Sequence, residues 1–172
     1  MSVVQAVELE NVSEADWDEV VAGEVEPWGS RIGEAFDWLR KTRHVGVREN
    51  GRLLAMAGLL RAPVSVADAH FDVAGIGGVI VTRPRRGEGL GRAVIEAAIG
   101  LAPELATSRA MLFSLPANVP LYEKFSFKAI SAAVFVRQPS GMVEMPMCAM
   151  WRPLVAGVDW PEGRVELPDG PF

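Results

Sequence analysis

Three glycines and two arginines lie close together in the middle of the chain, in the run Arg86-Gly87-Glu88-Gly89-Leu90-Gly91-Arg92. An apolar segment precedes this run and a segment of helical periodicity follows it, which predicts a strand, a turn and a helix in that order. The first turn of a helix has backbone N–H groups without partners and the positive end of the helix dipole. Because glycine has no side chain, an anion can reach these groups directly. The run therefore predicts a cradle for an anion, best suited to a pyrophosphate.

Two common phosphate-binding patterns do not fit this run. A Walker loop requires Gly-Lys-Ser/Thr, whereas Gly91 is followed by Arg92 and Ala93. The dinucleotide fingerprint requires a third glycine at the place that Arg92 occupies. The pattern that remains is Arg-x-x-Gly-x-Gly. Alone it is a weak signal, but its place between an apolar strand and an amphipathic helix makes it a much stronger indication of an anion site.

The surrounding elements must hold this turn in position, and their order predicts a mixed α/β fold in which several helices flank one sheet. The chain shows no internal repeat, so we expect one domain over residues 1–172 with an irregular tail at 158–172. Strands are predicted at 3–9, 44–47, 53–60, 71–82, 110–115, 129–136 and 142–151, and helices from Ser13 to near Gly23, from Ser30 to about residue 39, and at 90–101 and 118–125.

Glycines give two further structural expectations. Asn50-Gly51 between apolar runs predicts a tight hairpin. Residues 63–68, which contain no glycine, are predicted separately to form a loop. Gly75, Gly77 and Gly78 lie inside the long apolar run at 71–82. A strand of this kind has a bulge, or another group lies close against it.

Composition excludes several classes of protein. With 49% apolar residues in 172, the chain has enough material for a hydrophobic core. Its net charge of −5 argues against a general nucleic-acid binder. The single cysteine, Cys148, excludes a disulfide framework and a cysteine-rich zinc site, so no metal is expected. The sequence shows neither an apolar secretory signal nor a membrane-length run, so we expect a cytoplasmic protein without a membrane partner.

The charges are distributed unevenly. Residues 1–40 carry ten acidic residues and two arginines, a net −8, whereas Arg83, Arg85, Arg86 and Arg92 have only Glu88 among them. This pattern indicates two ligands of opposite sign, or alternatively the solvated faces of two acidic helices.

A second motif supports a family resemblance. The run Asn118-Val119-Pro120-Leu121-Tyr122-Glu123-Lys124-Phe125-Ser126-Phe127 follows the strand predicted at 110–115. Together with the glycine run, it resembles the GNAT superfamily of N-acetyltransferases. The specific motifs cover about residues 70–136, and the order of elements extends the resemblance to the whole chain. Ser126 stands where the family usually has glycine.

The resemblance implies a mostly antiparallel sheet with a V-shaped splay between the fourth and fifth strands, at 71–82 and 110–115, flanked by helices. It also implies acetyl-CoA as acetyl donor, and it allows a homodimer with the tail as a candidate interface. Asn118 would contact the pantetheine arm, although it is also a candidate helix cap, and Tyr122 would be catalytic, near the sulfur. The other implied cofactor-binding residues are Val79, Ile80 and Val81 for the pantetheine, and Arg86, Gly87, Glu88, Gly89, Leu90, Gly91 and Arg92 for the pyrophosphate.

The implied reaction is direct attack of an amine on the thioester in a ternary complex. A backbone N–H near Ile80 or Val81 would stabilise the oxyanion, and Tyr122 would protonate the departing thiolate. The general base stays open, because residues 75–78 offer no carboxylate. Candidates are Asp72, His44, His70, and through water Glu24, Glu26, Glu34 or Asp37.

The acceptor is predicted with less detail. The acidic N-terminal region favours a cationic small molecule or peptide with a primary amine, for which Glu26, Trp28 and Asp37 are candidate contacts. Phe172 is a further candidate, because some relatives that acetylate aminoglycosides end in an aromatic residue whose carboxylate reaches the active site. The alternative for this tail is a surface strap.

Two other functions remain open at this stage. One is an aminoglycoside 2′-N-acetyltransferase-like resistance enzyme. The other is a non-catalytic acyl-CoA-sensing module, which the missing glutamate on the fourth strand favours and Tyr122 opposes.

Overall fold

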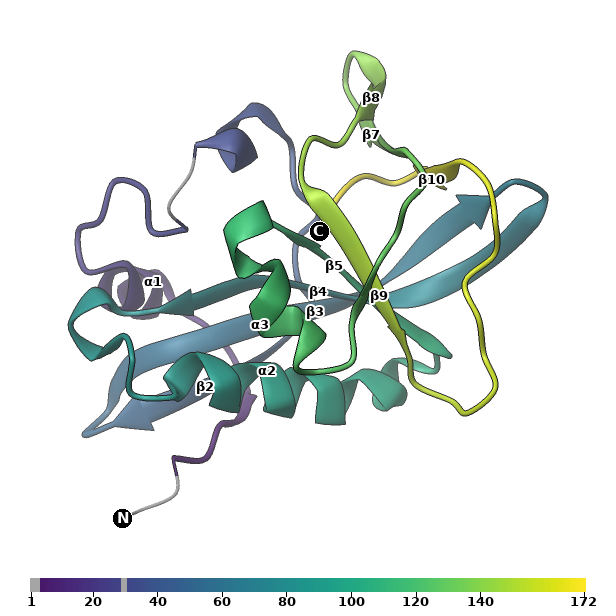
Figure 1. The fold of residues 1–172 in the computed structure, drawn as a ribbon. Coiled ribbons are helices and arrows are strands. Elements are labelled where there is room, and N and C mark those ends of the chain that lie inside the picture. Colours follow the sequence, from purple (N-terminus) through teal and green to yellow (C-terminus); the bar gives the residue numbers. More distant parts are fainter. Residues whose placement is uncertain (1–3, 29–30) are drawn as a thin grey trace.

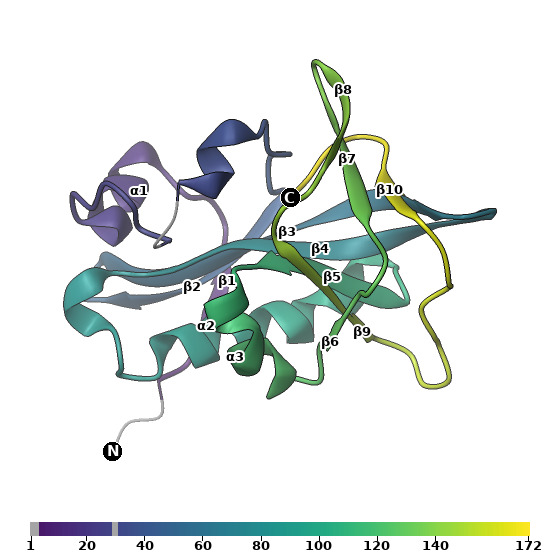
Figure 2. The same cartoon turned by 45° about the horizontal axis from the view of Figure 1, so that its top comes forward.

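The computed structural model describes residues 4–28 and 31–172. A curled sheet crosses the molecule, with α1 and η1 over one face and α2 and α3 over the other (Figures 1 and 2). The strands are β1 (Val7–Leu9), β2 (Arg43–Glu49), β3 (Arg52–Val66), β4 (Ala69–Val81), β5 (Arg109–Ser114), β6 (Lys128–Ala129), β7 (Val134–Gln138), β8 (Gly141–Glu144), β9 (Cys148–Pro153) and β10 (Val165–Leu167). The helices are α1 (Glu14–Val21), α2 (Leu90–Leu101) and α3 (Val119–Glu123), with short 3₁₀ turns η1 (Ile32–Ala35), η2 (Arg83–Arg85), η3 (Ala102–Leu105) and η4 (Pro116–Asn118).

The sheet is mostly antiparallel, in the order β6-β9-β5-β4-β3-β10-β7-β8, with β1 and β2 added beside β3. Two pairs run parallel, β10 with β7 and, at the centre of the sheet, β4 with β5. Only residues 74–76 of β4 pair with residues 110–112 of β5, and the two strands then separate. This confirms the predicted splay, and it leaves residues 77–81 of β4 without a neighbour on that edge.

Apolar side chains hold a helix against each face of the sheet. On one face, Val94, Ile95 and Ala98 of α2 join the largest hydrophobic cluster. On the other face, Val20 of α1 packs with Leu53 and Met56 of β3 and Ile80 of β4. The buried stripe predicted for 90–101 is therefore confirmed.

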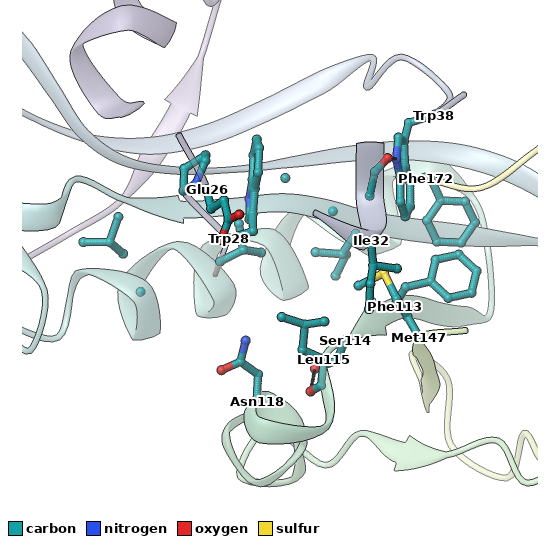
Figure 3. A pocket seen from close by; sticks show the side chains of 18 of the residues that line it. Glu26, Trp28, Ile32, Trp38, Phe113, Ser114, Leu115, Asn118, Met147 and Phe172 are labelled. Atoms are coloured by element: carbon teal, nitrogen blue, oxygen red, sulfur yellow. Dashed lines mark hydrogen bonds between the residues drawn. The ribbon is translucent and has the colours of Figure 1, made fainter. Parts of the chain in front are cut away.

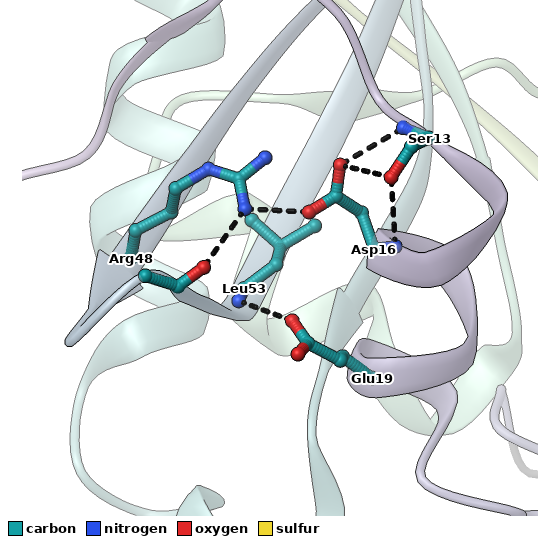
Figure 4. Close-up of polar contacts among 6 residues, drawn as sticks. Ser13, Asp16, Glu19, Arg48 and Leu53 are labelled. Atoms are coloured by element: carbon teal, nitrogen blue, oxygen red, sulfur yellow. Dashed lines mark hydrogen bonds and ion pairs between the residues drawn. The ribbon is translucent and has the colours of Figure 1, made fainter.

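Helix α1 is held to the hairpin of β2 and β3 by polar contacts (Figure 4). Ser13 and Asp16 form the predicted capping box. Asp16 also accepts a hydrogen bond from Arg48 of β2, and this contact, with the bonds from Ser13, keeps the pKa of the Asp16 carboxyl well below its usual range. The backbone N–H of Leu53 donates to Glu19 at 3.1 Å. These contacts fix the start of the segment that leads to the cavity described below.

The glycine-based expectations are confirmed. Asn50 and Gly51 both have positive φ, 51° and 82°, as a tight hairpin turn of the primed type requires. The register of β3 and β4 shifts between Met56 and Gly58, opposite Gly78, whose φ is 61°. Strand β4 therefore has a bulge at the point where β5 leaves it.

One predicted helix and one predicted loop were wrong. The helix predicted from Ser30 to about residue 39 is reduced to η1, and Ser30 itself lies outside the described residues. The indole of Trp38 donates to the Gly33 carbonyl at 2.6 Å, which occupies a group that a continuing helix would use. The loop predicted at 63–68 is instead the end of β3, which turns only at Ala67.

The strand predictions after residue 128 were also too simple. Each of the two strands predicted at 129–136 and 142–151 is divided into two strands. The first becomes β6, which pairs with β9, and β7, which pairs with β8. The second becomes β8 and β9, with Pro146 between them. The tail predicted to be irregular contains β10, which pairs with β3 and β7. Among the described residues, none of the helices combines the length and apolar character that crossing a bilayer requires.

Candidate active site

A cavity of about 790 Å³ lies where β4 and β5 separate (Figure 3). The gap in the sheet exists because the parallel pairing ends at Ile76 and the bulge at Gly78 turns β4 away. Residues from the glycine run, from α3 and from both ends of the chain line the same space, among them Arg86, Gly91, Asn118, Tyr122, Trp28 and Phe172.

The glycine run forms an open turn at the start of α2. Gly87 and Gly89 have φ values of 85° and 84°, which favour glycine, and Gly89 occupies the N-cap position of the helix. A Cβ on either residue would meet no protein atom within 4 Å. Glu88 and Arg92 are exposed beside this turn, while Leu90 packs into the core. The backbone of this turn is therefore unobstructed, which is compatible with the predicted anion cradle.

The arginines near the glycine run are less available for contacts with an anionic ligand than the sequence indicated, because most of them pair with carboxylates. Arg85 bonds to Glu49 and Glu88, and Arg92 bonds to Glu96. Arg83 is the only one of the four arginines without a carboxylate partner among the described residues. The attraction for an anion thus comes mainly from the backbone and the helix dipole.

Arg86 lies at the boundary between the turn and the N-terminal segment. Its guanidinium donates to both carboxylate oxygens of Glu24, to the Pro27 carbonyl at 3.2 Å and to the Val81 carbonyl at 3.1 Å. The side chain therefore ties the segment before Trp28 to the end of β4, in addition to any role toward a phosphate.

The edge of β4 that faces the gap in the sheet holds the residues predicted to bind the pantetheine arm. The side chains of Val79 and Val81 line the cavity. Ile80 points to the opposite face and packs against Leu53 and Met56, so only its backbone can serve a ligand in the cavity.

Asn118 and Tyr122 enter the cavity from η4 and α3. Asn118 occupies the N-cap position of α3, as predicted, but its side chain makes no capping hydrogen bond there. Its amide instead points into the cavity (Figure 3). Tyr122 is 8% exposed and packs edge-on against Phe127. Burial raises the pKa of Tyr122 to about 12, so the phenol stays protonated at neutral pH and is available as a donor.

Aromatic side chains dominate the other half of the cavity. Glu26 and Trp28 lie on one side, and Trp38, Phe113 and Phe172 lie on the other (Figure 3). Phe172 is buried and its ring stacks near that of Phe113 at 5.4 Å, so the tail reaches the cavity and is not a surface strap. Trp17, Ile32, Glu34, Leu115 and Met147 complete this part of the lining.

The carboxylates predicted to attract a cation are mostly engaged elsewhere. Glu24 is paired with Arg86, and Glu26 and Glu34 both lie near Arg31, at 3.4 and 3.5 Å. Asp37 is exposed and outside the cavity lining, because Gln138 holds its backbone N–H at the surface.

Three other candidate bases also lie outside the cavity lining. Asp72 pairs with Arg61, and the His70 ring is within hydrogen-bond distance of Ser65, at the far end of the hairpin of β3 and β4. His44 is half-buried beside Gly58, and burial, followed by the charges of Lys41 and Arg40, lowers its pKa.

Lys41 is a cavity residue that sequence reasoning missed. The sequence placed it near the end of the predicted second helix, whereas the structure places it in the cavity wall. Burial lowers the pKa of Lys41 to about 8. The available signal was Gly58 and Gly77, two glycines inside strands, because both lie against the lysine side chain. Within the described residues there is no cluster of three or more potential metal ligands.

The fold is a mixed α/β architecture whose splayed sheet opens onto a cavity beside the glycine run. Residues 9–127 match the model of the Acetyltransferase (GNAT) family, and the chain belongs to this family. No curated protein sequence matches the chain significantly.

Solved structures agree with this assignment at the level of the fold. The chain is 17% identical to YhbS, a GNAT family N-acetyltransferase from Escherichia coli in complex with CoA, with 98% of this chain and 92% of that chain covered and a TM-score of 0.60. It is 17% identical to the ribosomal-protein-S18-alanine N-acetyltransferase from Escherichia coli, with 92% and 100% covered and a TM-score of 0.57. A putative N-acetyltransferase from Lactobacillus plantarum is 18% identical, with 88% and 99% covered and a TM-score of 0.59.

Proposed function

We propose that the protein transfers the acetyl group of acetyl-CoA to a primary amine by direct attack within a ternary complex. The observation that carries this proposal is the continuous cavity that reaches the glycine run at Arg86 and Gly91 and joins it, with the open edge of β4 and the Tyr122 side chain, to an aromatic pocket. One half suits the donor and the other half suits an acceptor. The CoA bound to the fold relative YhbS is consistent with this donor.

The residues on the donor side fit an acyl-CoA. Gly87 and Gly89 leave backbone free for a diphosphate, and the β4 edge at residues 77–81 leaves backbone free for the amides of a pantetheine arm. Asn118 has an uncommitted amide in the same space. When bound, acetyl-CoA supplies the thioester that the amine attacks.

The transfer requires two protein groups at the reacting atoms. The amine nitrogen forms a bond to the carbonyl carbon while the carbon–sulfur bond breaks, and the nitrogen loses a proton while the thiolate gains one. In this proposal, backbone N–H groups at the bulge around Gly78 stabilise the oxyanion. Tyr122 donates a hydrogen bond to the sulfur and keeps its own proton, because its pKa of about 12 lies above the value of about 8.5 for the parent thiol. The amine nitrogen releases its proton to solvent, and the departing thiolate takes one up from solvent.

The acceptor in this proposal is a primary amine with no requirement for further positive charge. Sequence reasoning favoured a cationic acceptor, but Glu24, Glu26 and Glu34 have arginines as neighbours. An additional cation would therefore meet little uncompensated negative charge in the cavity.

The test combines binding with thiol release. We expect acetyl-CoA to bind in calorimetric titration and to release free thiol in the presence of at least one member of a broad amine panel, aminoglycosides included. Acetyl-CoA that binds without thiol release for any amine would favour a sensing module. Failure of CoA to bind would exclude both functions.

A further inference from the structure

Lys41 lies in a groove made by two glycines on neighbouring strands. Gly58 of β3 and Gly77 of β4 are partners in the sheet register. A Cβ on Gly58 would overlap Cγ of Lys41, and a Cβ on Gly77 would lie 2.9 Å from Cε of Lys41. Glycine inside a strand weakens a sheet, because it has no side chain to pack. At this position the two glycines leave the space that the aliphatic part of the Lys41 side chain occupies.

Lys41 lies in this groove next to the residue at which the bulge of β4 begins. Gly77 directly precedes Gly78, whose backbone turns away from β5. The same side chain lines the cavity together with Trp38, Phe113 and Phe172. Lys41 therefore lies between the proposed oxyanion site and the aromatic pocket.

The positive charge of Lys41 has no carboxylate partner among the described residues. Its ammonium group donates to the Leu39 carbonyl at 3.3 Å, and no ion pair joins it to another residue, including Phe172, whose carboxyl carbon also borders Gly77. Glu26 and Glu34 lie near Arg31, and the nearby groups Arg40 and His44 are not acids. Among the described residues, the acid close to the lysine stem is the carboxyl group of Phe172, which makes no ion pair with Lys41. A half-buried cation that no carboxylate bonds directly can bind the anionic group of a ligand.

We propose that Lys41 binds the carboxylate of an α-amino acid with an aromatic or large apolar side chain, and that this amino acid is the acetyl acceptor. This inference rests on the proposed acetyltransferase function. In an α-amino acid the amine and the carboxylate share one carbon, so a carboxylate at Lys41 places the amine beside the bulge of β4. Trp28, Trp38 and Phe113 surround the space that remains for the side chain.

The same arrangement disfavours other amines. The ammonium group of Lys41 repels a polyamine or an aminoglycoside, and a simple arylalkylamine leaves the lysine without a partner. In the reaction, the α-amine nitrogen forms the amide bond to the acetyl carbon and loses a proton, while the CoA sulfur leaves and takes one up. The products are an N-acetyl amino acid and CoA.

The experiment compares matched acceptors that differ only in the carboxylate. Phenylalanine, phenylalaninamide and phenethylamine share the ring and the amine, and equivalent sets are made for tryptophan, leucine and methionine. With the unmodified protein, we expect kcat/KM for the best amino acid to exceed that for its amide and its decarboxylated amine by about 10²-fold, as for a charge-assisted contact.

Lys41→Met is the test variant and Lys128→Met, on the exposed strand β6, is its matched control. Lys41→Met is expected to lower kcat/KM for the amino acid about 10²-fold and to raise it for the decarboxylated amine, because a repelling charge is removed. Lys128→Met is expected to change neither value. Calorimetric binding of the N-acetyl amino acid, which needs no turnover, should weaken only in Lys41→Met.

Two results would overturn this inference alone. One is turnover of amides or simple amines at rates equal to those of the amino acids. The other is an equal loss of activity on all acceptors in Lys41→Met, which would make Lys41 a general base. Absence of thiol release with every amine would instead refute the proposed function, and with it this inference.

Discussion

Tyr122 and Lys41 are polar groups buried in the same cavity, and burial moves the pKa of each toward its neutral form. The pKa of Tyr122 rises to about 12 and that of Lys41 falls to about 8. At neutral pH the phenol is fully protonated, while the amine remains mostly charged. The cavity therefore presents one neutral donor near the proposed sulfur position and one cation near the proposed acceptor.

Tyr122→Phe tests the role of the phenol. No described protein group hydrogen-bonds the Tyr122 hydroxyl, so its removal should leave the free energy of unfolding nearly unchanged. We expect kcat to fall about 10²-fold while the Kd of CoA stays the same, because the hydroxyl acts only on the sulfur that leaves. Steady-state kinetics and calorimetry measure the two quantities, and an unaltered kcat would remove Tyr122 from the mechanism.

Lys41→Met should also alter stability in a pH-dependent way. The pKa of Lys41 is about 8 in the folded chain and 10.5 when unfolded, so below pH 8 the folded state holds an unfavourable buried charge. At pH 7 the variant should gain up to about 3 kcal/mol in free energy of unfolding. This gain should shrink between pH 8 and 10.5, where the unmodified folded state releases its proton. Denaturant unfolding across this range measures it, with Lys128→Met as control, and a gain independent of pH would contradict it.

At the scale of elements, the sequence predicted the structural elements around the proposed donor half of the cavity and missed much of what builds the proposed acceptor half. The glycine turn, the amphipathic α2 and the bulge of β4 follow from local signals: unobstructed backbone, apolar periodicity and glycines within a strand. The splay of β4 from β5 came from the family resemblance. All these features involve residues between 71 and 125.

The acceptor half depends on contacts between distant segments, which local patterns do not encode. Lys41 is buried because Gly58 and Gly77 face each other, and Phe172 reaches the cavity because Gly75 leaves room for its ring. The ion pair of Arg86 and Glu24 spans 62 residues, so the sequence showed only an excess of charge on each side.

Gly89→Val tests the element on which donor binding depends. The branched side chain would occupy the open space at the N-cap of α2, so we expect the Kd of CoA to rise by 10²-fold or more. Because Gly89 has a φ of 84°, the substitution also strains the backbone by about 1–2 kcal/mol. Gly157→Val is the control, since Gly157 has a φ of 79°, equally open surroundings and a position outside the cavity lining.

The two Gly→Val variants separate strain from ligand exclusion. Both should lose similar stability in denaturant unfolding, and only Gly89→Val should lose CoA binding in calorimetry. Wild-type affinity in Gly89→Val would refute the anion cradle.

At the scale of the whole molecule, the segment before β2 and the C-terminal tail build one wall of the cavity. The segment before β2 and the last residues of the chain lie side by side, as both views of the ribbon show (Figures 1 and 2). The Leu39 N–H donates to the Pro171 carbonyl at 2.7 Å, and the rings of Trp38, Phe113 and Phe172 pack in sequence. Strand β10 anchors this tail between β3 and β7. The acceptor wall is thus complete only when the tail is folded onto the sheet.

Phe172→Ala tests whether this closure shapes the acceptor site. The ring is 2% exposed and lies against Gly75, so its loss should lower the free energy of unfolding by about 3–4 kcal/mol. The enlarged cavity should reduce kcat/KM for the acceptor at least tenfold by loosening its position, while the Kd of CoA stays unchanged because the glycine turn lies on the other side. Phe135→Ala, on β7 outside the cavity lining, is the matched control and should affect stability without affecting acceptor kinetics. Equal kinetic losses in both variants would show that general destabilisation, and not the position of Phe172 in the cavity wall, accounts for the effect.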